Sequence, residues 1–417
     1  MSRLASEGGR PVRKDFLVFG KPQIGEDEIR EVVDTLRSGW IGFGPKSLRF
    51  EDEFASYVRA EHVLSVNSAT AALHLALIAA GVGEGDEVAT TPLTFCATAN
   101  VIAHVGAKPV FVEVDEATQN IDPERLARAI TPRTKAIMVV HMTGWPCDMD
   151  AITEIAERHH IPVIEDAAHA TETWYRARKV GSISRFTAFS FYATKNMTTG
   201  EGGALAINDE QAWDRLRALR LHGLDKDAWK RYSPGAYMPY EVLEPGFKYN
   251  MTDLQASLGI HQLARLEENL EIRKRIWTAY DDAFADLEEV ITPQMKDTAH
   301  TRHARHLYTL RLVPERMGCE RNRFVSELAS ENIGSGVHFV PVHLHRWYRE
   351  HFGYNRGDFP IAEAIGDTTV SLPMSPAMTM ADAEDTIAAV RKIVEARRTV
   401  PVFAPGFDGE DDLREAA

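Results

Sequence analysis

The amino-acid sequence predicts an α/β protein, with a large domain built on a mainly parallel sheet and a smaller α/β domain after it. Two observations lead to this prediction. Short β-rich segments and helical segments alternate through the first 210 residues, and apolar β-branched runs joined by amphipathic helices are typical of a parallel sheet buried on both faces. The chain is also 417 residues long, which exceeds what one ordinary hydrophobic core accommodates.

The alternation can be followed segment by segment. Strands are expected within residues 62–68, 86–93, 108–115, 134–142, 161–168, 186–191 and 202–209. Helices are expected between them, within residues 70–82, 94–106, 122–130 and 148–160. None of these helices opens with a Gly-rich GxGxxG segment, so a dinucleotide-binding Rossmann domain has little support.

The second half of the chain is expected to begin with one long helix that links two domains. Its start is predicted at the capping box Thr252-Asp253-Leu254-Gln255, after which apolar residues recur at roughly helical spacing. The last residues are rich in Pro and Gly and then acidic, as expected of a loosely held tail. The expected organisation is an N-terminal arm over 1–20, a large domain over 21–250, the linking helix over 251–290, a small domain over 291–400 and the tail over 401–417.

Composition narrows the classes of partner. With 47 Lys+Arg against 61 Asp+Glu, the net charge is −14, which argues against nucleic acid or an anionic membrane as the main partner. Three cysteines, Cys96, Cys147 and Cys319, form no CxxC pair and no even disulfide framework, which favours a reducing compartment. The sequence shows no apolar leader and no run long enough to span a membrane. We therefore expect a cytoplasmic protein, and no pattern suggests a metal site.

The segment SFYATKNMTTGEGG, residues 190–203, contains an isolated lysine. Lys195 follows aromatic and small residues, no acid comes before Glu201, and glycines lie just beyond. Most lysines are solvated surface residues. A lysine in a partly dry pocket has a lowered pKa, and its neutral amine can serve as a nucleophile or a Schiff-base partner.

An acid is expected near this lysine. Asp166 ends the buried run PVIED, and ligands of open α/β sheets bind beyond the carboxyl ends of the strands. A helix cap explains Asp166 about equally well when it is taken alone. Paired with Lys195, it suggests a pyridoxal phosphate (PLP) site, with the lysine for the Schiff base and the acid for the pyridinium nitrogen.

Two further segments suit the same cofactor. Ser68-Ala69-Thr70 lies where a strand meets a helix, a place where backbone N–H groups and hydroxyls bind phosphate, although an ordinary N-cap is the commoner outcome. Phe95, after another expected strand, could stack on a flat ring, although such an aromatic is more often part of a core.

The chain resembles the DegT/DnrJ/StrS family of sugar-nucleotide aminotransferases from about Gly20 to Arg398. The resemblance is strongest to the subgroup of UDP-4-amino-4-deoxy-L-arabinose synthase, through the KYN and VHF elements. Six segments occur in the family's order and spacing: NSATAALHLAL, GDEVATTPLTFCATAN, IEDAAHA, SFYATKNMTTGEGG, EPGFKYNMTDLQAS and GVHFVPVHLHRWYRE.

This resemblance implies a fold-type I PLP enzyme with a mainly parallel seven-stranded sheet. By matching position, Lys195 is the Schiff-base lysine and Asp166 the partner of the ring nitrogen. The other cofactor-binding residues implied are Phe95 on the ring, His169 beside it, and Ala69, Thr70, Ser190 and Asn250 on the phosphate. Asn250 would come from the neighbouring subunit of a homodimer, so the active sites would be at the subunit interface. The substrate-binding residues implied are Trp40, Phe43 and His338.

The implied reaction takes the amino group of L-glutamate, through the pyridoxamine 5'-phosphate form of the cofactor, to C4 of a nucleotide-linked 4-keto sugar. Alternatives are a C3 sugar aminotransferase and a PLP-binding regulatory protein without turnover; a cysteine desulfurase would need a mobile catalytic cysteine that no loop motif supplies. Phe43 and Trp145 depart from residues that are common in the family, and Phe95 stands where the arabinose enzyme of that subgroup has tryptophan. They leave the cofactor chemistry intact and the sugar open, because differences of methyl size near a pocket change which substituents fit, by about 1–3 kcal/mol each.

Overall fold

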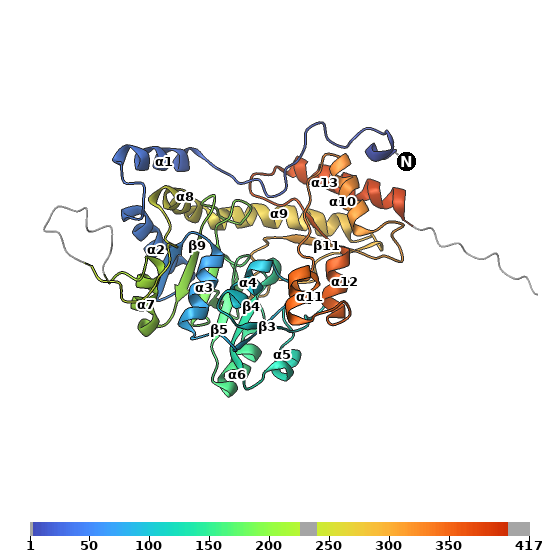
Figure 1. Ribbon diagram of the computed structural model, residues 1–417. Coiled ribbons are helices and arrows are strands. Elements are labelled where there is room, and N and C mark those ends of the chain that lie inside the picture. The colour runs from blue at the N-terminus through green and yellow to red at the C-terminus, as the bar shows by residue number, and fades with distance from the viewer. Residues whose placement is uncertain (1–2, 226–239, 399–417) are drawn as a thin grey trace, which may run out of the picture.

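The structure, a computed structural model, describes residues 3–225 and 240–398. At its centre lies a seven-stranded sheet with the strand order β1-β9-β8-β5-β4-β2-β3 (Figure 1). The expected tail, 401–417, lies outside the described residues. The strands are β1 (His62–Val66), β2 (Glu87–Thr90), β3 (Lys108–Phe111), β4 (Thr134–Val140), β5 (Val163–Asp166), β8 (Phe186–Ser190) and β9 (Gly203–Ile207).

The sheet is mainly parallel, as the alternating pattern predicted. Strands β8, β5, β4, β2 and β3 pair in parallel, and β9 runs antiparallel to both β8 and β1. All seven predicted strands are present. Because β9 alone runs the other way, its first residue, Gly203, meets the carboxyl ends of the others at one edge of the sheet, and this edge carries the site described below.

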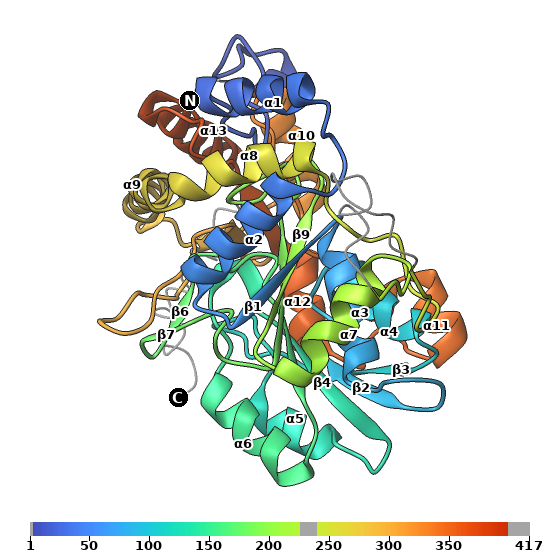
Figure 2. The same ribbon diagram turned by 90° about the vertical axis from the view of Figure 1, so that its left-hand side faces the viewer.

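Helices cover both faces of the sheet, which is why its strands are almost wholly buried (Figure 2). On one face α3 (Ala69–Ala79), α4 (Cys96–His104) and α7 (Glu210–Arg220) share a hydrophobic cluster with the strands. On the other face α2 (Pro45–Val58) and α8 (Asp253–Ala264) pack on one half of the sheet. The other half is covered by α5 (Pro123–Ala129) and α6 (Met149–His159).

The predicted linking helix is in fact two helices. Thr252 begins α8 with the predicted capping box, but the helix ends at Ala264 and α9 (Leu266–Phe284) starts after Arg265. Arg265 has φ −109° and ψ 12°, outside helical geometry. Its guanidinium donates to the carbonyl of Gln23 and to Glu28, so this side chain ties the junction to the first turn of α1 (Glu26–Ser38) and to the segment before it.

A smaller α/β layer follows α9. Its antiparallel sheet contains β10 (Val290–Ile291), β11 (Tyr308–Leu312) and β12 (Thr369–Leu372). These strands, α9, α10 (Arg321–Ser330) and α13 (Met380–Arg397) form one hydrophobic cluster. In the chain between α10 and β12, α11 (Arg346–Phe352) packs against β3 and α4, and α12 (Pro360–Thr368) packs against Leu93 and Val114 of the large domain.

The N-terminal arm lies against this smaller layer (Figure 1). Leu4 is buried in its hydrophobic cluster, and Leu17 forms a β-bridge with Ile333. The carboxylate of Glu331 accepts from the backbone N–H groups of Ala5 and Val12. The segment from Leu4 to Leu17 therefore helps to stabilise this smaller layer. Among the helices in the described ranges, none is both long enough and apolar enough to cross a bilayer.

Candidate active site

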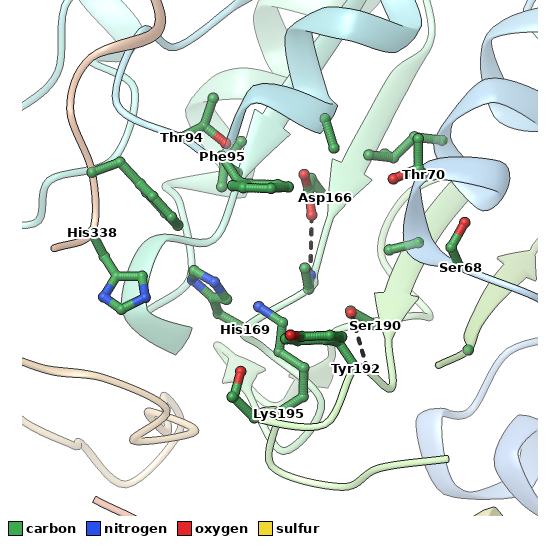
Figure 3. Close-up of a pocket in the computed structure, with 18 of the residues that line it drawn as sticks. Ser68, Thr70, Thr94, Phe95, Asp166, His169, Ser190, Tyr192, Lys195 and His338 are labelled. Atoms are coloured by element: carbon green, nitrogen blue, oxygen red, sulfur yellow. Dashed lines mark hydrogen bonds between the residues drawn. The ribbon is translucent and has the colours of Figure 1, made fainter. Parts of the chain in front are cut away.

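One cavity of about 490 Å³ lies at the carboxyl edge of the large sheet. Because parallel strands end at the same edge, side chains far apart in the sequence meet there. Figure 3 shows the predicted residues Lys195, Asp166, His169 and Phe95 around this cavity, together with His338 from the smaller domain. The volume is typical of a site for a small molecule.

Lys195 lies in the loop between β8 and β9, and its amine points into the cavity (Figure 3). Its backbone N–H donates to the carbonyl of Tyr192, which fixes a turn. Burial lowers the pKa of Lys195 to about 8, although the charge of Asp166 acts in the opposite direction. About a tenth of this amine is therefore neutral at pH ~7, far more than for an ordinary lysine, and the neutral form is the one that a nucleophile or base requires.

Asp166 is the last residue of β5 and lines the cavity. The residue is 6% exposed. Oδ2 accepts from the Thr98 hydroxyl at 2.8 Å, and Oδ1 accepts from the Ala168 N–H at 3.1 Å. Burial raises the pKa of Asp166, and these two donors together with the charge of Lys195 act against that rise. A cationic N–H placed in the cavity would stabilise the ionised carboxylate further.

Two histidines face the same cavity and stay neutral. Burial and the nearby Lys195 lower the pKa of His169 well below its ordinary value, and they lower that of His338 to about 4. Within the described residues Nδ1 of His169 is buried without a hydrogen-bond partner. Nδ1 of His338 is 2.7 Å from the Ser371 hydroxyl on β12, so the small domain positions this ring.

The far end of the cavity has the features of an anion site. Ser68 caps α3, and its hydroxyl accepts from the Ala71 N–H at 3.1 Å. The N–H groups of Ala69 and Thr70 are the donors that a helix start leaves free, and they carry the positive end of the helix dipole. Ser190, at the end of β8, adds a hydroxyl. The predicted phosphate-binding residues Ala69, Thr70 and Ser190 therefore lie together.

A glycine makes this arrangement possible. Gly203 opens β9 directly against the start of α3, and a Cβ there would lie 2.5 Å from the carbonyl carbon of Ser68 and 2.6 Å from the nitrogen of Ala69. Real Cβ atoms do not approach backbone so closely, so only glycine lets β9 pass the helix N-terminus at this point.

Aromatic side chains line the entrance of the cavity. Phe95 precedes α4 and is 58% exposed, which is a large exposure for a phenylalanine outside a binding site. The centroid of its ring lies 6.0 Å from that of Phe339. Tyr192, 46% exposed, lines the same cavity beside Lys195. A flat ring that entered the cavity would meet aromatic faces there.

Three predicted residues do not line this cavity, although all three belong to the described ranges. The Trp40 indole N–H donates to the carbonyl of Phe43, and the Phe43 ring lies 4.5 Å from the guanidinium carbon of Arg220. Asn250 forms a β-bridge with Val66, and its side-chain N–H donates to the carbonyl of Met251 at 3.0 Å.

Sequence reasoning missed other residues that the fold brings to Lys195. Phe339 and Tyr192 lie in segments that had already been singled out, and an aromatic next to a site residue was the available signal. His306 and Asn196 lie just behind the cavity wall, and their ring and amide are 2.9 Å apart. No local sequence pattern pointed to His306 and Asn196 as a pair, because they are 110 positions apart in the chain.

The chain is similar to a known protein family and to individual proteins over most of its length. The model of the DegT/DnrJ/EryC1/StrS aminotransferase family matches residues 22–391. The spore coat polysaccharide biosynthesis protein SpsC of Bacillus subtilis is 52% identical over 384 residues, which are 92% of this chain and 98% of SpsC. An uncharacterized protein of Methanocaldococcus jannaschii is 50% identical over 93% of this chain and its own full length.

Among solved structures, the putative sugar aminotransferase Spr1654 of Streptococcus pneumoniae is similar in both its PMP form and its PLP form. The PMP form has a TM-score of 0.85 and 36% identity, over 91% of this chain and 99% of that one. The PLP form has a TM-score of 0.84 and 35% identity, over 91% and 99%.

Proposed function

This chain belongs to the DegT/DnrJ/EryC1/StrS aminotransferase family, and we propose that it transfers the amino group of L-glutamate to C4 of a nucleotide-linked 4-keto sugar. It is a PLP-dependent sugar aminotransferase. The proposed acceptor is of the dTDP-4-keto-6-deoxyglucose or UDP-4-keto-pentose type, and the products are a 4-amino sugar nucleotide and 2-oxoglutarate. The convergence of Lys195 and Asp166 in one cavity carries the chemistry of this proposal.

The residues around the cavity fit PLP. Asp166 is a buried carboxylate that can accept a further, cationic donor, which suits a protonated ring nitrogen. The start of α3 and the Ser190 hydroxyl suit a phosphate dianion. Lys195 is half-buried and its amine has a lowered pKa, which suits a covalent bond to the cofactor's aldehyde. Phe95 would cover one face of the ring.

In the proposed mechanism each residue has one task. When bound, PLP supplies a carbonyl that condenses with amines and a ring that accepts electrons. Lys195 would hold the cofactor and, once displaced by the incoming amine, act as the base that takes up a proton and returns it. Asp166 would keep the ring nitrogen protonated. His169 and His338, neutral at this site, add no positive charge beside Lys195, so its amine remains free to accept the proton.

The reaction is proposed to take place in a homodimer whose active sites lie at the subunit interface. Asn250 would reach the phosphate of the second subunit, and Trp40 and Phe43 would contact its substrate, which agrees with their position away from their own cavity. The α1 helix supports this proposal, since Ile29, Val33 and Leu36 lie on one exposed stripe of it.

Three free cysteines support a cytoplasmic setting.

Mixed dimers test the shared site. Lys195→Ala and Asn250→Ala subunits, refolded or co-expressed together, produce hybrids in which one of the two sites has both native residues. We expect such mixtures to bind PLP more tightly than the Asn250→Ala dimer and to regain turnover that the Lys195→Ala dimer lacks. A mixture no better than the average of its two parents would contradict the shared site.

The acceptor is tested with a panel of 3-keto and 4-keto nucleotide sugars, with L-glutamate as donor. Product mass and NMR assign the carbon that carries the new amine, and 2-oxoglutarate is assayed in parallel. An amine on C4 supports the proposal, whereas an amine on C3 replaces it with the C3 activity. Bound PLP with no transfer to any acceptor would identify a regulatory protein.

Two lysine variants control the same assay. Lys195→Ala is expected to remain folded and to lose transamination. Lys179→Met is the matched control, because Lys179 is buried and its pKa is also lowered, to about 7, but it does not line the cavity. Normal turnover in Lys195→Ala would refute the proposed mechanism.

A further inference from the structure

Asn196 follows Lys195 directly and has no part in the mechanism above, yet it is 7% exposed and both its amide nitrogen and its amide oxygen have hydrogen-bond partners. Its Nδ2 donates to Glu172 Oε2 at 2.7 Å and to the carbonyl of Ala304 at 3.1 Å. Its Oδ1 lies 2.9 Å from Nδ1 of His306. Because Nδ2 faces two acceptors, Oδ1 must face His306, which therefore donates from Nδ1.

The carboxylate that Asn196 binds is held from the opposite side by a cation. Glu172, 0% exposed, forms an ion pair with Arg273, 1% exposed, on α9. The same guanidinium donates to the carbonyl of Ala304. A buried ion pair tolerates little movement, since each charge depends on the other for its solvation. Asn196 is therefore tied to the helix that leads into the small domain.

The third partner leads back to the cavity. The ring of His306 lies 4.5 Å from the ring of His169, centroid to centroid, and His169 lines the cavity. His306 is buried, and burial together with Lys195 lowers its pKa well below the ordinary value, so the ring is neutral. A neutral imidazole that donates from Nδ1 presents an acceptor nitrogen at Nε2. The Asn196 bond thus sets both the tautomer and the orientation of the ring that packs on His169.

We propose that Asn196 is a positioning residue for the catalytic lysine, which it fixes to the Glu172–Arg273 ion pair on one side and to His306 on the other. The proposal rests on the assignment of Lys195 as the lysine that holds PLP. Two elements of the site, the Lys195 loop and the His169 ring, depend on this one amide. An amine displaced by even 1 Å loses rate steeply, because proton transfer and bond formation need the reacting atoms at contact.

Asn196→Ala tests this role, since it removes the amide and leaves the ion pair intact. Asn208→Ala is the matched control. Asn208 also donates twice from Nδ2, to the carbonyls of Gly181 and Ser184, and accepts once, from the Glu61 N–H. It follows β9 at the end of the sheet opposite the cavity. Both variants lose three hydrogen bonds, so a purely structural role predicts similar behaviour.

These measurements distinguish a positioning role of Asn196 from a purely structural one. In the holoenzyme we expect both variants to lower the thermal midpoint, but only Asn196→Ala to move the pH midpoint of the cofactor's visible band and to slow the return of that band when PLP is added to apoprotein. We expect kcat to fall about 10- to 100-fold in Asn196→Ala, with the KM for L-glutamate nearly unchanged. A band, a reconstitution rate and a kcat like those of Asn208→Ala would overturn the proposal.

His306→Phe provides a second route if Asn196→Ala does not fold. It keeps an aromatic ring against His169 and removes both ring nitrogens, including the Nδ1–H that Asn196 accepts. We expect the band midpoint to shift in the same direction, and an unchanged midpoint and kcat would again overturn the proposal. Lys195→Ala distinguishes failure of the Lys195 assignment from failure of the role of Asn196. A visible band that persists in Lys195→Ala refutes the Lys195 assignment, whereas loss of the band in Lys195→Ala together with native behaviour of Asn196→Ala refutes only the role of Asn196.

Discussion

The lowered pKa of Lys195 gives a prediction that can be worked through in numbers. The pKa is about 8 in place of the usual lysine value of 10.5, with burial as the main cause and the charge of Asp166 opposing it. At pH ~7.5 roughly a quarter of such amines are neutral, against roughly 0.1% of ordinary lysines, a difference of about 240-fold. Since only the neutral amine attacks an aldehyde, the apoprotein should capture PLP far faster than an exposed lysine does.

The assay is the rate at which apoprotein gains the cofactor's visible band, measured across the pH range. We expect the rate of the native protein to rise with a midpoint near pH 8. Asp166→Asn removes the charge that raises the pKa of Lys195, so its midpoint should be lower. Asp150→Asn, an exposed acid paired with Arg176 and Arg178, should leave the midpoint unchanged.

Two results would refute this reasoning. A native midpoint near 10 would mean that Lys195 is solvated and that the cavity does not desolvate it. A midpoint that rises in Asp166→Asn would mean that the carboxylate does not act on the amine through its charge. The measurement concerns capture of the cofactor and needs no sugar substrate.

Three further predictions concern other parts of the molecule. Asp166→Asn should stay folded and lose most of the transamination rate, which steady-state kinetics with L-glutamate would show; an unchanged rate would remove its role on the ring nitrogen. Gly203→Ala should weaken PLP binding, measured by fluorescence titration, because its Cβ would lie 2.5 Å from Ser68; native affinity would mean that the start of α3 does not bind the phosphate. Burial lowers the pKa of Lys179 to about 7, so this residue binds fewer protons in the native state than in the unfolded chain. The resulting loss of native-state stability is fully present below pH 7 and is relieved as the pH rises toward 10.5. Thermal unfolding should therefore show Lys179→Met more stable than the native protein at pH 7, by up to about 5 kcal/mol, and the difference should shrink by pH 9.5; a constant difference would contradict the shift.

Much of the large domain could be predicted because its information is local. Apolar β-branched runs mark β4 and β5 as buried strands, and the rule that parallel strands share a carboxyl edge placed Asp166 beside the site. The isolated Lys195 could be singled out by the absence of charged neighbours in the sequence. These inferences needed only residues close together in the chain.

The remainder depended on contacts that no local pattern encodes. The break at Arg265 was missed because the apolar spacing runs on through it, and only the contacts of its guanidinium with Gln23 and Glu28 show what holds the junction. Asn196 was missed because its partners, Glu172 and Ala304, are 24 and 108 residues away. Buried polar networks of this kind become visible only when the chain is folded.

The most direct test of the account is the absorption spectrum of the holoenzyme before and after L-glutamate is added, with 2-oxoglutarate assayed in the same tube. The account predicts a visible band that depends on Lys195, its replacement by the band of the pyridoxamine form, and release of one equivalent of 2-oxoglutarate per site. A visible band that is unchanged after L-glutamate is added, with no 2-oxoglutarate released, would contradict L-glutamate as the amino donor.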